Sequence, residues 1–134
     1  MLACTDAGRA KWVESLANEL DVPPNFVFKR RHDNGYPEIR AMIADVEGRS
    51  VVIYDDMIRS GDSLLNAARV YWDSGAESVA AVTTHGLSPG EEIFRIAKSG
   101  IIDRLVCTNC HPGSLRAAAS SWRSVPLFPC WPTR

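Results

Sequence analysis

Residues 51–63 have the sequence V-V-I-Y-D-D-M-I-R-S-G-D-S, and this stretch decides the fold. The run at 51–54 is β-branched and aromatic, which favours a strand buried on both faces. Asp55 and Asp56 follow where such a strand leaves its sheet, and a polar loop then leads into a helical pattern that starts at Leu64. Ligands bind beyond the carboxyl ends of strands in an open parallel sheet, so we expect the chemistry here.

The polar loop has the parts of a phosphate-binding site. Gly61 lets the backbone approach a ligand closely, and Ser60 and Ser63 supply hydroxyl groups. The helix that follows directs unpaired N–H groups and a partial positive charge at an anion. An ordinary strand–loop–helix turn, with Ser60, Asp62 or Ser63 as the N-cap, fits the same spacing. The spacing alone leaves both interpretations open.

The two carboxylates are candidate ligand acceptors. Asp55 and Asp56 suit sugar hydroxyls or Mg2+. Because adjacent strand residues point to opposite sides, we do not expect them to share one proton as an acid/base pair.

Residues 51–63 resemble the ribose-phosphate-binding motif of type I phosphoribosyltransferases and of ribose-phosphate diphosphokinases (PRPP synthetases). The usual form is an apolar strand followed by D-D-M-I-D-T-G-G-T. Two positions depart from it: Arg59 replaces an acidic residue, and Asp62 stands where glycine is common. We expect the Asp62 carboxylate to weaken phosphate binding at this loop.

Three further segments resemble the diphosphokinases. Residues 6–12 resemble a D-x-G-x-x-K-x-A stretch whose aspartate helps to bind Mg2+, which implies a metal role for Asp6; a simple helix N-cap is the alternative. Lys29 and Arg31 match a K-x-R pair that stabilises the phosphoryl group in transfer, and a solvated strand end is the alternative. Thr84-His85-Gly86 matches the end of a later strand, where a structural role for His85 stays open.

The other patterns along the chain alternate between helix and strand. Strands are expected at 26–31, 51–54, 78–84 and 105–107, with candidates at 39–46 and 124–128. Helices are expected from residue 13 to 21, from 64 to 73 and from 89 to 99, with a candidate at 114–121. This order predicts an α/β fold with a parallel sheet flanked by helices in three layers. The resemblance implies the type I phosphoribosyltransferase-like fold, formed by residues 1–134 as a single domain.

Composition excludes several classes of protein. The chain has 134 residues and a net charge of −1, without a basic block, so nucleic acid is not an expected partner. It has no apolar run of membrane-spanning length and no signal-peptide pattern, so we expect a cytoplasmic protein without membrane contact. Residues 107–111 fit the haem-attachment pattern C-x-x-C-H, but the alternation of strands and helices opposes a haem protein.

The resemblance implies ribose-phosphate diphosphokinase chemistry, in which pyrophosphate moves from ATP to ribose 5-phosphate with Mg2+ and gives PRPP. The loop of Arg59, Ser60, Gly61, Asp62 and Ser63 would hold the 5-phosphate, and Asp55 and Asp56 the ribose hydroxyls. The chain begins where the second domain of that family begins, and we expect it to be inactive alone and to form a homo-oligomer. A phosphoribosyltransferase that consumes PRPP and a non-catalytic ribose-phosphate-binding module are the alternatives.

Overall fold

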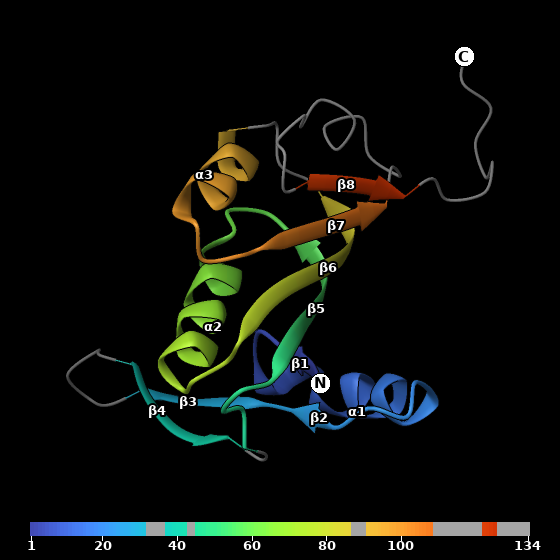
Figure 1. The fold of residues 1–134 in the computed structure, drawn as a ribbon, viewed down its shortest axis with the longest axis vertical. Coiled ribbons are helices and arrows are strands. Elements are labelled where there is room, and N and C mark those ends of the chain that lie inside the picture. The colour runs from blue at the N-terminus through green and yellow to red at the C-terminus, as the bar shows by residue number, and fades with distance from the viewer. Residues whose placement is uncertain (32–36, 43–44, 87–90, 109–121, 126–134) are drawn as a thin grey trace.

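The computed structural model describes residues 1–31, 37–42, 45–86, 91–108 and 122–125. Within them lies a six-stranded sheet in the order β2-β1-β5-β6-β7-β8, and all of its strand pairs are parallel (Figure 1). Its strands are β1 (Leu2–Cys4), β2 (Pro24–Asn25), β5 (Ser50–Ile58), β6 (Ser78–Gly86), β7 (Arg104–Thr108) and β8 (Trp122–Val125). A separate antiparallel hairpin consists of β3 (Val27–Arg31) and β4 (Pro37–Met42).

Helices cover both faces of the sheet, as predicted. A 3-10 turn, η1 (Ala7–Arg9), leads into α1 (Ala10–Glu19), and the later helices are α2 (Asp62–Asp73) and α3 (Glu91–Ser99). The alternation of β5 assigns the faces: Val51 and Ile53 are buried with residues of α2 and α3, whereas Val52 and Tyr54 pack against the cluster that includes α1. The result is the three-layer α/β architecture.

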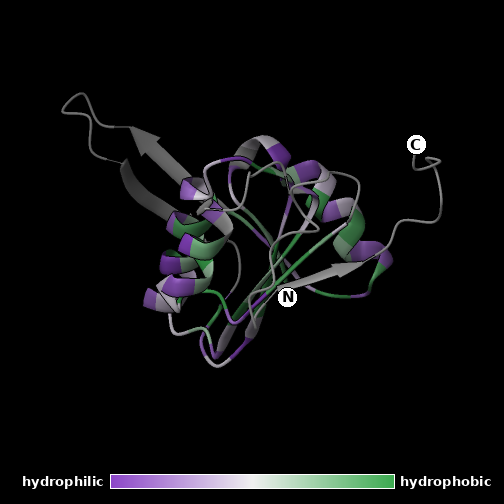
Figure 2. Cartoon of the chain, turned by 90° about the horizontal axis from the view of Figure 1, so that it is seen from above, coloured by the Kyte–Doolittle hydropathy of each residue, from purple (hydrophilic) through white to green (hydrophobic). Residues whose placement is uncertain are grey.

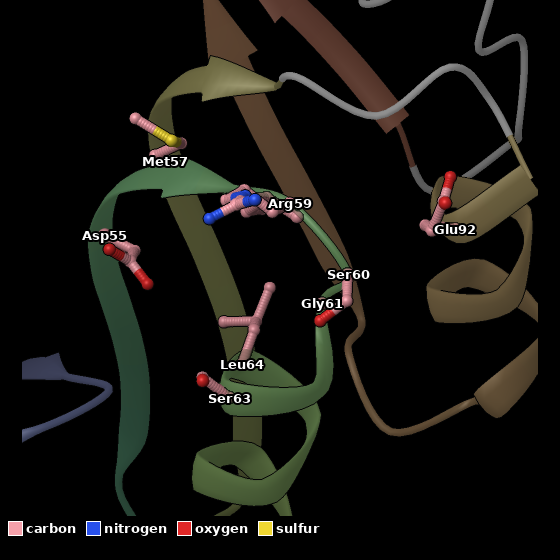
Figure 3. A pocket seen from close by; sticks show the side chains of 9 residues that line it. Asp55, Met57, Arg59, Ser60, Gly61, Ser63, Leu64 and Glu92 are labelled. Atoms are coloured by element: carbon pink, nitrogen blue, oxygen red, sulfur yellow. The ribbon is translucent and has the colours of Figure 1, made fainter.

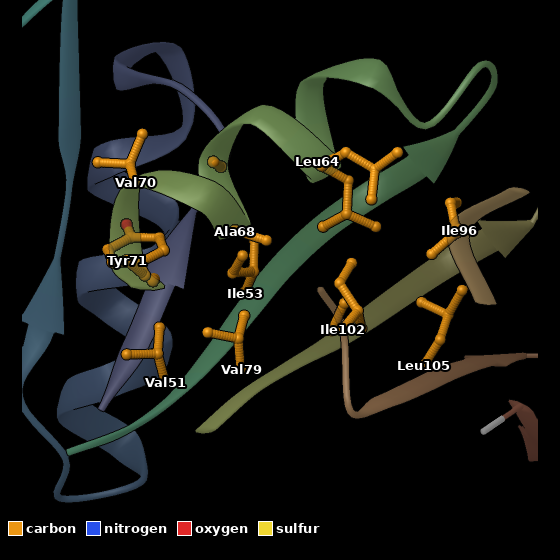
Figure 4. Close-up of a cluster of buried hydrophobic side chains, with 14 of the residues drawn as sticks. Val51, Ile53, Leu64, Ala68, Val70, Tyr71, Val79, Ile96, Ile102 and Leu105 are labelled. Carbon is orange, nitrogen blue, oxygen red and sulfur yellow. The ribbon is translucent and has the colours of Figure 1, made fainter. Parts of the chain in front are cut away.

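The hydrophobic core lies mainly between the sheet and α2. Figure 4 shows Val51, Ile53 and Val79 of the sheet beside Ala68 and Tyr71 of α2, and all five are buried. The helices carry hydrophobic residues toward the sheet and hydrophilic residues on the outer side (Figure 2). Amphipathic helices on a largely apolar parallel sheet therefore account for the layers.

The ends of the helices follow from local sequence. Gly75 has φ 86° after α2, and its N–H donates to the Trp72 carbonyl oxygen at 2.9 Å. The Ala76 N–H donates to the Tyr71 carbonyl oxygen at 3.0 Å, which completes a Schellman motif. The first helix ends at Glu19, earlier than expected, so Leu20 at its C-cap is 57% exposed instead of facing the core.

The strand order reverses direction between β1 and β5. The chain runs from β1 to β2 at one edge and later places β5 on the other side of β1. In open α/β sheets this reversal opens a crevice at the carboxyl ends of the two strands, where ligands bind. The fifth strand also continues to Ile58, so Asp55 pairs in register with Thr83 and lies within the strand, not beyond it as expected.

Several predictions concern residues outside the described part of the chain. The candidate helix at 114–121 lies there, as do Cys110, His111 and the end of the candidate strand at 124–128. Cys107 is described and is buried in the hydrophobic core, a poor position for covalent attachment of haem. Among the described residues, no helix is both long enough and apolar enough to cross a lipid bilayer.

Candidate functional site

A cleft of about 590 Å³ lies over the carboxyl end of β5 and the N-terminus of α2 (Figure 3). It is lined by Asp55, Met57, Ile58, Arg59, Ser60, Gly61, Ser63, Leu64 and Glu92. Five of these were predicted from the sequence as ribose-phosphate-binding residues: Asp55, Arg59, Ser60, Gly61 and Ser63. The fold therefore brings a carboxylate, a guanidinium group, two hydroxyls and a glycine backbone to one opening.

Gly61 begins α2 under two constraints that only glycine meets. It is the N-cap residue with φ 77°, in the left-handed region, and it offers no side-chain cap. A Cβ atom there would lie 2.7 Å from Cδ1 of Ile96 on α3. Gly61 therefore holds the N-cap position, and Ser60, Asp62 and Ser63 do not. The Ser60 hydroxyl accepts the Asp62 N–H at 3.4 Å. The first turn of α2 thus keeps the positive end of a helix at the cleft.

Asp62 faces α3 and does not line the cleft. Its Oδ1 atom lies 2.8 Å from Nη2 of Arg95, and the same Arg95 nitrogen donates to the Ser60 carbonyl oxygen. The hydrogen bond with the Ser60 hydroxyl and the ion pair with Arg95 both lower the pKa of Asp62. The carboxylate that we expected to repel a phosphate is therefore balanced by a cation of the next helix.

The two carboxylates of β5 share one guanidinium group. Arg9 of η1 places Nη2 2.6 Å from Oδ1 of Asp56 and Nε 3.4 Å from Oδ1 of Asp55. Thr5, just after β1, donates its hydroxyl to Oδ2 of Asp55 at 3.0 Å. These contacts join the ends of β1 and β5 across the crevice at the strand-order reversal.

Asp55 and Asp56 do not point to opposite sides as expected, because both reach the same arginine. Burial raises the pKa of Asp55, and the hydrogen bond from Thr5 and the charge of Arg9 act against this rise. The neighbouring Asp56 carboxylate raises the pKa further. The prediction that the pair would be separated was therefore wrong at this position of the strand.

The remaining predicted residues are Asp6, which does not line the cleft, and Lys29 and Arg31 of the hairpin. Oδ1 of Asp6 accepts the Gly8 N–H at 2.8 Å, which is the turn geometry of the N-cap alternative. Lys29 and Arg31 belong to the hairpin, where they pair in register with Ile39 and Pro37. Their positions two apart on one strand agree with the sequence, and their roles stay predictions.

Hydrogen bonds of Thr84 join the end of β6 to its neighbouring strands. The sequence analysis singled out Thr84 but not these bonds. The Tyr54 hydroxyl and the Thr84 hydroxyl are hydrogen-bonded at 2.8 Å, and Thr108 donates to the Thr84 carbonyl oxygen. Thr84 therefore connects β5, β6 and β7. His85 follows it as an exposed residue in register with Met57.

The sequence analysis did not predict four polar or charged residues at the site: Thr5, Arg9, Glu92 and Arg95. Thr5 and Arg9 flank Asp6, so their proximity to a candidate residue was the available signal. Glu92 and Arg95 come from α3, about 30 residues beyond the loop, and no local pattern links them to it. Among the described residues, no three His, Cys, Asp or Glu side chains gather to form a metal site by themselves.

Comparison with known proteins assigns the family. The profile of the phosphoribosyl synthetase-associated domain matches residues 12–125. The ribose-phosphate pyrophosphokinase of Hyphomonas neptunium is 37% identical over 126 residues, which cover 92% of this chain and 40% of that protein. That of Brucella melitensis is 35% identical over 112 residues, which cover 84% of this chain and 36% of that protein. The chain thus spans 36–40% of the length of these two relatives.

Solved structures agree with this assignment. The phosphoribosylpyrophosphate synthetase of Mycobacterium smegmatis superposes with a TM-score of 0.80 and 26% identity, over 93% of this chain and 40% of that one. The orotate phosphoribosyltransferase of Aeropyrum pernix, at 23% identity and a TM-score of 0.54, covers 71% of this chain and 54% of its own, and shares the fold. The resemblance seen in residues 51–63 is confirmed, and the chain belongs to the phosphoribosyl synthetase-associated domain family, with the fold of type I phosphoribosyltransferases.

Proposed function

We propose that this chain is a ribose-phosphate-binding domain of the ribose-phosphate pyrophosphokinase type, which takes ribose 5-phosphate or PRPP into the cleft over β5 and α2. The observation that carries the proposal is the composition of that cleft. It combines the N-terminus of α2 and Arg59, which favour an anion, with Asp55, which accepts hydrogen bonds from hydroxyl groups. A phosphorylated sugar has both kinds of group in one small molecule.

The 5-phosphate would lie on the loop at the start of α2. The first N–H groups of a helix have no partner within it, and Gly61, Ser63 and Leu64 at this N-terminus line the cleft. Ser60 and Ser63 add hydroxyl donors, and Arg59 adds an exposed positive charge. The ribose hydroxyls would donate to the carboxylates of Asp55 and Asp56.

Mg2+ fits the donor set at this end of the sheet. Mg2+ prefers oxygen ligands and binds through one or two carboxylates together with phosphates and water, so a cluster of three acidic side chains is not required. One or two of the carboxylates of Asp6, Asp55 and Asp56 would hold it together with phosphate and water, and the ion would neutralise phosphate charge there. Arg9 already contacts Asp55 and Asp56, so the metal would share these oxygens with a protein cation.

The pyrophosphokinase step itself is assigned to a longer polypeptide or an assembly. The curated relatives are more than twice as long as this chain. The resemblance to PRPP synthetases implies that ATP is held largely by another domain and by a neighbouring subunit. Lys29 and Arg31 would stabilise the transferring group there. Because positioning supplies most of the catalysis in phosphoryl transfer, these two cations without a held donor achieve little. The 134-residue chain alone should therefore bind ribose 5-phosphate weakly and make no measurable PRPP.

Calorimetric titration tests the binding, with ribose 5-phosphate, ribose and inorganic phosphate as ligands in the presence of Mg2+. We expect ribose 5-phosphate to bind more tightly than phosphate, and ribose to bind least, because only the first uses both parts of the cleft. The absence of a binding heat with ribose 5-phosphate at millimolar concentration would refute the proposal.

An assay of AMP release from ATP and ribose 5-phosphate tests the activity. Binding without AMP release is the expected outcome and also supports the alternative of a non-catalytic ribose-phosphate-binding module. Turnover that Lys29→Ala abolishes would show that this chain suffices for the reaction.

A further inference from the structure

Arg9 holds the same carboxylate oxygens that a sugar would use. Its guanidinium group contacts Oδ1 of both Asp55 and Asp56, while Thr5 occupies Oδ2 of Asp55. Three of the four oxygens of this carboxylate pair therefore have a protein donor already. The shortest of these contacts, 2.6 Å, is a charge-assisted hydrogen bond, which is stronger than one from a neutral hydroxyl.

The Arg9 contact is placed so that it can be exchanged. The Arg9 side chain is 35% exposed and that of Asp56 is 40% exposed, so water reaches this pair, whereas Asp55 is 13% exposed. Arg9 ends η1, a single 3-10 turn, and no other acidic side chain among the described residues forms an ion pair with it. An ion pair as exposed as that of Arg9 with Asp56 contributes little free energy, so a ligand with several groups can overcome it.

We propose that the Arg9 side chain competes with the ligand for Asp55 and Asp56. Arg9 must be displaced before sugar hydroxyls can bond to these two carboxylates. This inference rests on the proposed function of the cleft. The affinity measured for the sugar is then lower than the intrinsic affinity, by the fraction of molecules in which Arg9 has left the carboxylates.

Competition of this kind selects for a phosphorylated sugar. Hydroxyl groups alone offer neutral donors against a guanidinium cation, so free ribose gains little when it displaces Arg9. A phosphate on the loop at the start of α2 supplies the additional binding free energy, and it does so without touching Asp55 or Asp56. Inorganic phosphate should therefore bind without displacing Arg9.

The matched variants are Arg9→Gln and Lys11→Gln, measured by calorimetry with ribose 5-phosphate and with inorganic phosphate. Each removes one positive charge near the start of α1, but Lys11 is exposed and has no ion pair with Asp55 or Asp56. Arg9→Gln should tighten ribose 5-phosphate binding by about two- to fivefold and leave phosphate binding unchanged. Lys11→Gln should tighten neither ligand, and Arg9→Lys, which keeps the charge, should stay near the wild type.

The outcomes separate this inference from the proposed function. Wild-type chain that binds neither ligand would overturn both. If the wild-type chain binds ribose 5-phosphate but Arg9→Gln binds it no more tightly than Lys11→Gln does, the proposed role of Arg9 is overturned. The cleft assignment then stays intact. Tightening of phosphate by the same factor as ribose 5-phosphate would also contradict it, since the effect would then be one of general charge.

Discussion

Replacement of Gly61 by alanine perturbs the site at the point where α2, α3 and the loop meet. Gly61 has φ 77°, a conformation that costs a residue with a Cβ atom about 1–2 kcal/mol. The added Cβ would lie 2.7 Å from Cδ1 and 3.0 Å from Cγ1 of Ile96, which is itself buried. Such overpacking costs about 1–3 kcal/mol. We therefore expect Gly61→Ala to lower the free energy of unfolding by about 2–5 kcal/mol.

Two control variants separate the backbone cost from the contact with Ile96. Gly48 has φ 66°, and a Cβ there would meet nothing within 4 Å, so Gly48→Ala should show the backbone cost alone. Ile96→Val removes the atom nearest to the added Cβ. In that background Gly61→Ala should be less destabilising by about 1 kcal/mol or more.

Urea unfolding at one pH measures the free energies of the wild type, the three single variants and the Gly61→Ala/Ile96→Val double variant. Calorimetry with phosphate measures ligand binding at the loop. Gly61→Ala should also weaken phosphate binding, because the loop must shift away from α3. Equal destabilisation by Gly61→Ala and Gly48→Ala, or no rescue by Ile96→Val, would refute the close approach of the loop to α3.

Two further predictions concern charges. Asp62→Asn should tighten phosphate binding by about two- to fivefold because it leaves Arg95 without its counterion, and Arg95→Ala should weaken phosphate binding. The factor is small because both side chains of this ion pair are at least half exposed. Calorimetry checks this, and a shift in the same direction for both variants would contradict it. Burial raises the pKa of the Cys4 thiol from 9.0 to about 11, so the unfolded chain loses this proton at a lower pH than the folded chain. The stabilisation by Cys4 is therefore complete below about pH 9 and should fall by up to about 2–3 kcal/mol toward pH 11. A pH series of urea unfolding should show this loss in the wild type and not in Cys4→Ala, and equal losses would argue against it.

The layers of the fold were predictable because the local patterns and the tertiary environment agree. The β-branched run at 51–54 is buried on alternate sides by different helices, and Gly75 ends α2 in the conformation that glycine favours. Leu20 shows where this agreement stops. Helical spacing assigned Leu20 to the apolar face of a helix that was expected to reach residue 21. Instead α1 ends at Glu19, and no sequence signal fixed that end.

Site residues that are consecutive in the sequence could be predicted, whereas those contributed by other elements of the fold could not. Asp55 and the loop that includes Ser60 and Gly61 are consecutive, so a strand–loop–helix pattern was enough to find them. Arg9 and Arg95 reach the same region from η1 and from α3, and their contacts depend on tertiary packing that spacing does not encode. The orientation of Asp56 was mispredicted for the same reason, because its interaction with Arg9 is tertiary.

Mapping of ribose 5-phosphate binding by NMR tests the central claim most directly. In a titration of 15N-labelled chain with Mg2+ present, the amide signals of Ser60, Gly61 and Ser63 should shift in a saturable way, together with that of Asp55. The amides of Ser78 and Arg104, at the start of β6 and β7, should stay in place because these residues lie at the opposite end of the sheet. Shifts confined to Ser78 and Arg104, or no saturable shift at Gly61 with millimolar ligand, would contradict the assignment of this cleft as a ribose-phosphate site.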